Sequence, residues 1–239
     1  MATLRALLFD IDGTIVDNEE LHRLCYNRAF LRSGVDWEWN RALYAELLLV
    51  SGGIDRLNAY LDRLAPEPEE RARLRTLIPF IHRTKTQEYA RRLEEGQVSI
   101  RPGILNLMKQ AGAAGVLIGC VSSSNWDNSG IVLDKALRSA SDIHIHARVG
   151  GEMVRRRKPA PDVYELLINM LRVSPDTCIA LDDSPNGVAS ARAAGAYVVA
   201  TPSQWTAGLD LSAANLVLPS LEGVSLADLE QRVKGPSRS

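Results

Sequence analysis

The sequence predicts an α/β protein: a parallel sheet covered by helices, with an all-helical segment inserted after the first strand. Four short apolar runs are continuous rather than alternating, as is typical of strands buried on both faces. These runs span residues 6–9, 116–121, 177–181 and 197–200. Helical patterns separate the last three runs, whereas residues 17–96 carry no convincing strand. Alternating strands and helices favour a parallel sheet.

The helices of the sheet region have recognisable ends. A helix over residues 104–114 follows Pro102 and Gly103, and a second, over 161–171, begins with a proline and an acidic residue. A third, over 185–194, stops at Gly195, a residue type that commonly ends helices. Residues 216–218 are expected to add an edge strand.

The inserted segment is rich in leucine, arginine, glutamate and alanine. We expect Pro79 to start or kink a helix, because proline cannot donate the backbone hydrogen bond of a helix interior. The sequence therefore predicts two domains: a Rossmann-like core over residues 1–16 and 98–239, and a helical domain over residues 17–97. The predicted helices of this domain span residues 20–32, 41–49, 55–64 and 67–95.

Composition bounds the function. The 239 residues are 46% hydrophobic and carry a net charge of -1, so no global field would recruit nucleic acid or a membrane. The cysteines, Cys25, Cys120 and Cys178, match no metal-ligand spacing, and we expect buried free thiols. An odd number of cysteines without a secretory signal favours a reducing cytoplasm. We expect a cytoplasmic monomer with neither a nucleic-acid nor a membrane partner.

Polar residues follow the predicted strands at their carboxyl ends, where open α/β sheets bind ligands. Asp10 and Asp12 follow the first strand, and Asp182 and Asp183 follow the third. The second strand is followed by Ser122, Ser123, Ser124 and Asn125, and a basic run ending in Lys158 lies before the third strand.

This set of side chains suits phosphoryl transfer. Carboxylates can hold Mg²⁺, which reduces the repulsion between a phosphate ester and an attacking anion. An aspartate can attack phosphorus, and a second acid can protonate the leaving alcohol and later activate water. A hydroxyl and a lysine can hold the remaining phosphoryl oxygens.

Simpler interpretations remain open for each motif. The stretch from Asp10 to Thr14 contains ordinary turn residues, and Asp182 with Asp183 could only cap the helix that starts near Pro185. The basic run 155–158 could be a solvated surface, and the serines after the second strand could be loop residues.

The motifs together resemble a known family. Asp10-Ile-Asp-Gly-Thr14, Ser122, Lys158-Pro159 and Asp182-Asp183 occur in the order of the four motifs of haloacid dehalogenase-like phosphatases. The segments 158–164 and 181–187 resemble the branch that contains beta-phosphoglucomutase and the CbbY proteins, which dephosphorylate xylulose-1,5-bisphosphate. The helical insert is similar to the α-helical cap domain of that superfamily.

The resemblance implies a role for each motif residue. Asp10 would be the nucleophile and a Mg²⁺ ligand, and Asp12 the general acid and base, with its backbone carbonyl on Mg²⁺. Ser122 and Lys158 would bind the transferring phosphoryl group. Asp183 would ligate the metal, and Asp182, one methylene shorter than the usual glutamate, would reach the metal site through water.

The resemblance also implies substrate contacts, most of them in the helical insert. Ile54 departs from the lysine expected after the paired glycines, which removes one expected contact to a second phosphate. Lys85 is expected to read that phosphate. The implied substrate-binding residues are Glu19, His22, Tyr44, Gly52, Gly53, Arg56, Lys85, Ser123, Ser124 and Asn125.

The expected function is a Mg²⁺-dependent phosphatase of a small phosphorylated sugar, namely xylulose-1,5-bisphosphate in a Calvin-cycle organism. Three alternatives stay open: a phosphomutase of the beta-phosphoglucomutase type, a phosphatase of phosphoglycolate or sugar monophosphates, and a non-catalytic phosphosugar-binding protein. Phosphate release separates the first and last of these from a phosphatase, and the ratio of turnover on mono- and bisphosphates separates the second.

Overall fold

The structure, a computed structural model, describes residues 3–96, 98–124 and 126–233. Its contacts divide the chain into two compact units. The α/β unit comprises Met1–Asp17 and Ser99–Ser239, and the helical unit comprises Asn18–Val98. The segments β2 (Val16–Asp17) and β3 (Ser99–Ile100) pair antiparallel where the chain leaves and re-enters the α/β unit.

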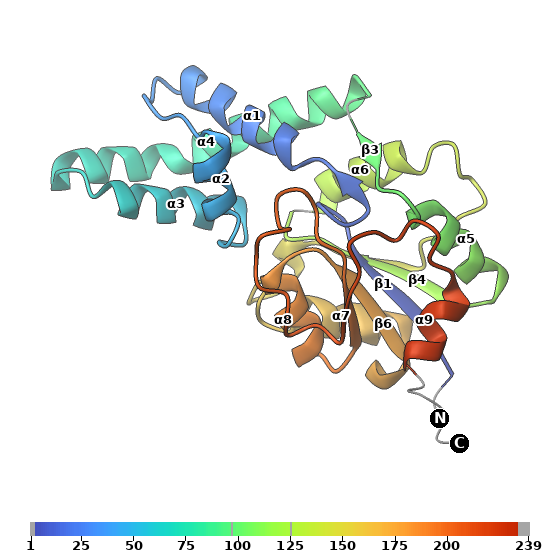
Figure 1. Cartoon of the computed structure of the whole chain (residues 1–239). Helices are drawn as coiled ribbons and strands as arrows, with labels where there is room; N and C mark the ends of the chain where they lie inside the picture. The colour runs from blue at the N-terminus through green and yellow to red at the C-terminus, as the bar shows by residue number, and fades with distance from the viewer. Residues whose placement is uncertain (1–2, 97, 125, 234–239) are drawn as a thin grey trace. The chain divides into compact units, whose positions relative to one another are not determined.

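Within the described residues, six parallel strands form the sheet of the α/β unit, which confirms the predicted fold class (Figure 1). Their order across the sheet is β5-β4-β1-β6-β7-β8. The strands are β1 (Ala6–Asp10), β4 (Leu117–Val121), β5 (Ala147–Val149), β6 (Cys178–Asp182), β7 (Tyr197–Ala200) and β8 (Leu216–Val217).

The helices of the α/β unit are α5 (Ile104–Ala113), α6 (Trp126–Ala136), α7 (Asp162–Leu171), α8 (Pro185–Ala193) and α9 (Leu226–Val233). The chain moves across the sheet in one direction from β1 through β4 to β5, and in the opposite direction from β6 to β7. Because such crossovers are right-handed, α7 and α8 cover one face and α5 and α6 the other. A buried apolar cluster contains side chains of α7, α8 and the strands, which confirms that these two helices pack on the same face of the sheet.

The reversal of direction lies between β1 and β6, the two central strands. Such a reversal is called a topological switch point, and open α/β sheets bind ligands there, in a crevice at the carboxyl ends of the strands. Asp10 is the last residue of β1 and Asp182 the last residue of β6, so the topology brings these two carboxylates to the same edge.

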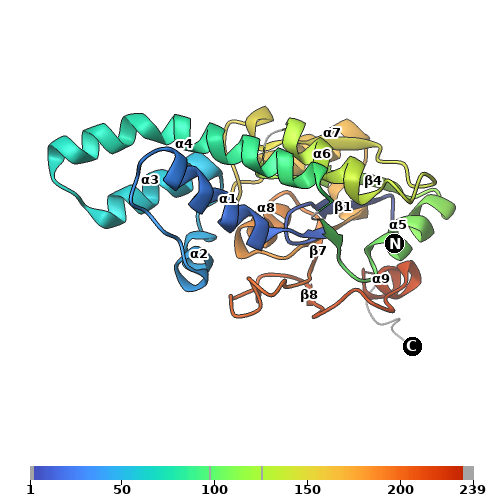
Figure 2. The same ribbon diagram turned by 90° about the horizontal axis from the view of Figure 1, so that it is seen from above.

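The helical unit consists of α1 (Glu19–Arg32), α2 (Arg41–Leu47), α3 (Gly53–Leu64) and α4 (Pro68–Glu94) among its described residues. Helix α4 contacts both α1 and α3, and it runs alongside α1 in two perpendicular views (Figures 1 and 2). Aromatic rings fill the interior of the helical unit, where Trp39 is fully buried and packs against Tyr26, Phe30 and Tyr60.

Pro79 begins no helix, contrary to the first of its two expected roles, because it lies inside α4. Its neighbours Ile78 and Ile81 are buried, and the packing of this face offsets the one backbone hydrogen bond that proline lacks. The three cysteines are buried free thiols as expected, and burial raises the pKa of Cys120 to about 12.

The ionisation of Glu88 in α4 should make the free energy of unfolding depend on pH. Its carboxylate accepts hydrogen bonds from Arg91 and Arg92. These hydrogen bonds, of which the one from Arg91 has the largest effect, and the charges of the two arginines lower the pKa of Glu88 from 4.5 to about 2. The resulting stabilisation is present above pH 4.5 and is lost as pH falls toward 2. Urea unfolding should give Glu88→Gln a deficit of about 1 kcal/mol at pH 7 that shrinks toward pH 3. A deficit that stays constant over this range would contradict the assignment.

Candidate active site

Three buried carboxylates and one ammonium group meet at the carboxyl end of the central strands. Asp10, Asp182 and Asp183 each offer an oxygen, and these oxygens lie within 4.8 Å of one another. The Nζ atom of Lys158 donates to Asp10 Oδ1 at 2.6 Å and to Asp182 Oδ2 at 2.7 Å. The exposed fraction of each of the four side chains is below 10%.

The charges of this cluster do not balance, because three carboxylates face one ammonium group. Burial raises the pKa of Asp10 well above its ordinary value; Lys158 opposes that shift, and the Asp182 and Asp183 carboxylates add to it. Burial lowers the pKa of Lys158, but the charges and hydrogen bonds of Asp10 and Asp182 raise it by more, so the pKa of Lys158 lies above its ordinary value. A divalent cation with oxygen ligands would relieve the excess negative charge, so the donor set fits Mg²⁺.

Two glycines allow the carboxylates to lie this close to the backbone. Gly13 has a φ of +87°, and a Cβ atom there would lie 2.5 Å from Asp183 Oδ2. A Cβ atom on Gly187 would lie 1.9 Å from Asp182 Oδ2. A side chain at either position would therefore displace a carboxylate of the cluster.

The other two predicted catalytic residues lie together in the α/β unit. Ser122 follows β4, is fully buried, and its hydroxyl donates to Asp12 Oδ2 at 3.0 Å. The same hydroxyl oxygen accepts from the backbone N–H of Ser124 at 2.9 Å. Ser123 and Ser124 are half-buried, and Asn125 lies outside the described residues.

The interpretation of Asp182 and Asp183 as helix caps is wrong. Ser184 is the N-cap of α8, and its hydroxyl oxygen accepts from the backbone N–H of Gly187. Asp182 Oδ1 instead accepts from the backbone N–H and the hydroxyl of Ser184, at 3.0 and 2.9 Å. Asp183 Oδ2 accepts from the hydroxyl of Thr206 at 3.0 Å.

Sequence reasoning gave no role to three residues that support this site. Tyr164 of α7 donates its hydroxyl to Asp182 Oδ2 at 2.8 Å, and Thr206 donates to Asp183. Arg101 donates to the backbone carbonyls of Gly13 and Thr201 and so braces the loop after β1. Tyr164 lies in the segment 158–164, so its position six residues after Lys158 was the available signal.

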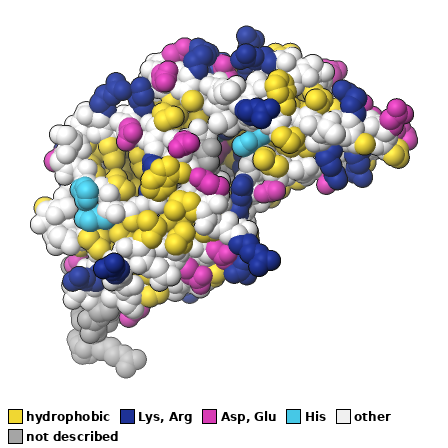
Figure 3. All heavy atoms as spheres, turned by 180° about the vertical axis from the view of Figure 1, so that it is seen from behind, with side chains coloured by type: hydrophobic (Ala, Val, Ile, Leu, Met, Phe, Trp, Pro, Cys, Tyr) yellow, Lys and Arg dark blue, Asp and Glu magenta, His cyan; other side chains and the backbone are white. Residues whose placement is uncertain are grey.

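The basic run goes from exposed at its first two residues, through half-buried at Arg157, to buried at Lys158. Arg155 and Arg156 are exposed, and Arg156 forms an ion pair with Asp162 at 2.7 Å. Lys158 is buried and precedes a cis peptide bond to Pro159. On the face seen in Figure 3, basic and acidic side chains are interspersed.

The predicted substrate residues of the helical unit form two groups within that unit. In the first, Tyr44 donates its hydroxyl to Glu19 Oε2 at 2.9 Å, and Arg56 Nη1 donates to the Tyr44 hydroxyl oxygen at 3.2 Å. In the second, Lys85 Nζ lies 2.6 Å from His22 Nδ1, and His22 stacks on Tyr89.

Both glycines predicted for substrate binding lie at the start of α3. Gly52 is its N-cap with a φ of 90°, and it fulfils the expectation of a helix break. A Cβ atom on Gly53 would lie 2.5 Å from His82 Nε2 and 2.7 Å from the Tyr26 hydroxyl oxygen. Packing within the helical unit therefore accounts for Gly53, and contact with a phosphate stays a prediction. Ile54 is exposed in the first turn of α3.

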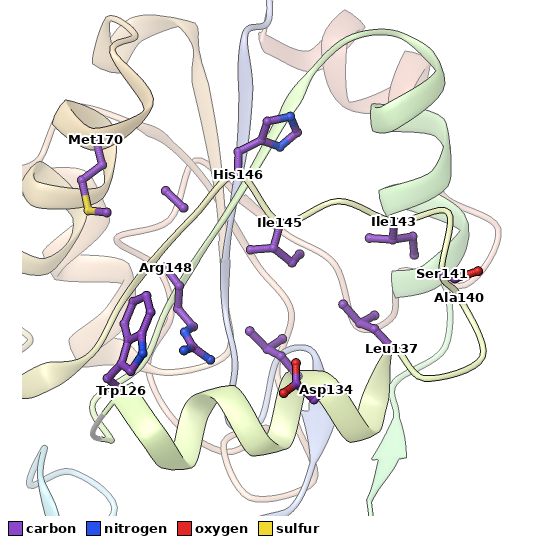
Figure 4. A pocket seen from close by; sticks show the side chains of 12 residues that line it. Trp126, Asp134, Leu137, Ala140, Ser141, Ile143, Ile145, His146, Arg148 and Met170 are labelled. Carbon is purple, nitrogen blue, oxygen red and sulfur yellow. The ribbon is translucent and has the colours of Figure 1, made fainter.

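A pocket of about 560 Å³ lies elsewhere in the α/β unit, beside the edge strand β5 (Figure 4). The Arg148 guanidinium lies 3.9 Å from the ring centroid of Trp126 at its wall. The pocket contains none of the predicted site residues. Its lining residues come from α6, the segment after it, β5 and α7: Trp126, Leu133, Asp134, Leu137, Ala140, Ser141, Ile143, Ile145, His146, Ala147, Arg148 and Met170.

Comparison with known proteins identifies the class. The family model of haloacid dehalogenase-like hydrolases matches residues 4–195. The chain therefore belongs to the haloacid dehalogenase-like hydrolase family, and the expected enzyme class, a phosphatase of that family, is confirmed. No helix among the described residues has the length and apolar character needed to span a bilayer.

Several relatives of this chain within the family are CbbY proteins. The chain is 36% identical to protein CbbY of Rhodobacter capsulatus over 93% of this chain and 96% of that protein. It is also 36% identical to a plasmid-encoded CbbY of Cupriavidus necator, over 97% and 91% of the two chains. A crystal structure of a CbbY mutant of Rhodobacter sphaeroides in complex with xylulose-1,5-bisphosphate matches with a TM-score of 0.83 and 33% identity, over 96% of this chain and 100% of that chain. These matches confirm the resemblance to the CbbY branch.

Proposed function

We propose that this protein is a Mg²⁺-dependent sugar-phosphate phosphatase that acts through an aspartyl-phosphate on Asp10, with xylulose-1,5-bisphosphate as its substrate. The observation that carries the proposal is the buried cluster of Asp10, Asp182, Asp183 and Lys158 at the switch point of the sheet. Its excess of negative charge favours a hard cation, and its one ammonium group suits a phosphoryl oxygen. The CbbY relatives support the choice of substrate.

Asp10 and Asp183 would hold Mg²⁺ through their carboxylates, and Asp12 through its backbone carbonyl. Asp182 already accepts hydrogen bonds at both oxygens, so we propose that it acts on the metal through water. When bound, Mg²⁺ would reduce the negative charge that a phosphate ester presents to an attacking anion.

The residues of the chain would then divide the reaction into two displacements. A carboxylate oxygen of Asp10 attacks phosphorus, and the bond from phosphorus to the sugar oxygen breaks as Asp12 protonates that oxygen. Asp12 next takes a proton from water, whose oxygen attacks the same phosphorus and releases Asp10 with inorganic phosphate. Lys158 and Ser122 hold the other phosphoryl oxygens in both steps.

The helical unit would serve as a cap domain that contributes substrate contacts. Its two polar groups, around Arg56 and around Lys85, supply positive charge suited to a second phosphate. Glu19 and Tyr44 would contact the sugar. We further propose that the protein works as a monomer in the reducing cytoplasm, in keeping with its buried free thiols.

A panel of phosphosugars tests the proposal, with release of inorganic phosphate as the readout. Xylulose-1,5-bisphosphate should give the highest kcat/KM of the panel, and a chelator in excess over Mg²⁺ should abolish release. An isomerised sugar phosphate in place of free phosphate would indicate a mutase. Higher kcat/KM on phosphoglycolate or on sugar monophosphates would indicate the other phosphatase class, and binding without release would indicate a binding protein.

Lys85 should discriminate between one phosphate and two. Lys85→Met removes the positive charge that we assign to the second phosphate, so kcat/KM should fall more for the bisphosphate than for the matching monophosphate. Lys109→Met, at an exposed lysine of the α/β unit, is the control and should leave that ratio unchanged. An equal loss on both substrates would mean that Lys85 does not read the second phosphate.

A further inference from the structure

The carboxylate of Asp182 is held on both of its oxygens. Oδ2 accepts from Lys158 Nζ at 2.7 Å and from the Tyr164 hydroxyl at 2.8 Å, and Oδ1 accepts twice from Ser184. Four hydrogen bonds therefore restrain the carboxylate, two at each oxygen. The side chain has no exposed surface, and the backbone of Gly187 lies directly against it.

Tyr164 contacts both members of the ion pair between Lys158 and Asp182. Its hydroxyl shares the oxygen that Lys158 uses, and Lys158 Nζ lies 5.1 Å from the centroid of its ring. Tyr164 is itself fully buried and is anchored in α7, whose apolar side chains pack against the sheet. A rigid aromatic group therefore supports the head of a long and flexible lysine side chain.

The ammonium group has three N–H donors, of which one points to Asp10 and one to Asp182. Those two bonds fix the direction of the third donor. If Asp182 turned about its side-chain bonds, the ammonium group would follow it and the third donor would lose its direction. The Tyr164 hydroxyl opposes that rotation, because it holds the same Oδ2 atom from a second side.

We infer that Tyr164 is a positioning residue, which acts through Asp182 to aim the Lys158 ammonium group at the phosphoryl group of the substrate. The inference rests on the proposed function, in which Lys158 binds that phosphoryl group. Tyr164 itself touches neither the substrate nor the metal in this account. Its contribution is the orientation of a donor that must be in place when the transition state forms.

The test is a double-mutant cycle between Tyr164→Phe and Asp182→Asn. Tyr164→Phe removes one oxygen atom and keeps the ring, so the core should stay packed. We expect kcat/KM to fall roughly tenfold or more, the range of a hydrogen bond to a charged group. In the Asp182→Asn background the same substitution should have little further effect, because residues that act through one another are not additive.

The affinity for inorganic phosphate in the presence of Mg²⁺, measured by titration calorimetry, gives a second readout that needs no turnover. Tyr164→Phe should weaken this affinity in the otherwise unchanged protein but not in the Asp182→Asn variant. If Asp182→Asn does not fold, Lys158→Gln replaces it in the same cycle. Tyr197→Phe, at a half-buried tyrosine of the same unit, is the control and should change neither kcat nor affinity.

Two results would overturn the inference: no effect of Tyr164→Phe, or the same factor in both backgrounds, which is the behaviour of a merely structural residue. The proposed function fails differently. In that case the unchanged protein would release no phosphate from any phosphosugar, while the phosphate-affinity cycle would still decide the role of Tyr164.

Discussion

Replacing Asp10 with asparagine should abolish turnover while leaving the fold intact. The amide of asparagine cannot attack phosphorus, so we expect kcat to fall on the order of a thousandfold or more. Asparagine has the size of aspartate, and the substitution removes one of three buried carboxylates. Because burial raises the pKa of Asp10, its charged form is unfavourable there, and the stability of Asp10→Asn should equal or exceed that of the unchanged protein.

The measurement is phosphate release combined with urea unfolding in the same buffer. Glu165→Gln, at a surface carboxylate of α7, is a matched control and should keep full activity. Full activity of Asp10→Asn would contradict the mechanism. Loss of activity together with loss of the folded state would show that Asp10 is required for folding. The metal dependence of the reaction would then be tested on the wild-type protein with an excess of chelator.

Lys158→Met should produce the largest loss of stability among the site variants. The ammonium group is the partner of two buried carboxylates, and its removal leaves Asp10 and Asp182 without it. Breaking a buried ion pair by deleting one partner costs about 3–5 kcal/mol. Turnover should also be lost, since the substitution removes the cation assigned to the phosphoryl oxygens.

Urea unfolding of Lys158→Met with and without Mg²⁺ checks this account. Mg²⁺ should restore part of the lost free energy of unfolding, because a divalent cation bound by the carboxylates stabilises only the folded state. Lys109→Met should show neither the loss nor the recovery, since Lys109 is exposed and its ion pair with Asp142, at 3.4 Å, lies in contact with solvent. A Lys158→Met variant as stable as the unchanged protein would mean that the buried charges are compensated in another way.

Sequence reasoning could locate the main strands because β1, β4 and β6 are buried on both faces and read as continuous apolar runs. It missed β5, which has three residues and carries an arginine at its centre. It also missed α6, whose Gly130 disfavours a helix. In the folded protein a Cβ atom at Gly130 would lie 2.3 Å from Arg148 Nη1, so the glycine leaves room for that guanidinium.

The acidic cluster could be predicted because its members end two adjacent strands, and strand ends converge at one edge of a parallel sheet. The partners of the cluster could not. Tyr164 and Thr206 lie on a helix and a loop that reach Asp182 and Asp183 only after the chain has folded. Serine at position 184 is a common helix cap, but its second role, donating to Asp182, depends on the sharp turn between β6 and α8.

Trapping the phosphorylated enzyme tests the central claim most directly. The protein is mixed with Mg²⁺ and xylulose-1,5-bisphosphate, quenched in acid within the first turnover, digested, and analysed by mass spectrometry. The account predicts one added phosphoryl group on the peptide that contains Asp10, absent from Asp10→Asn. Phosphate release at the normal rate without any phosphoryl group on Asp10, or with the group on another residue, would contradict it.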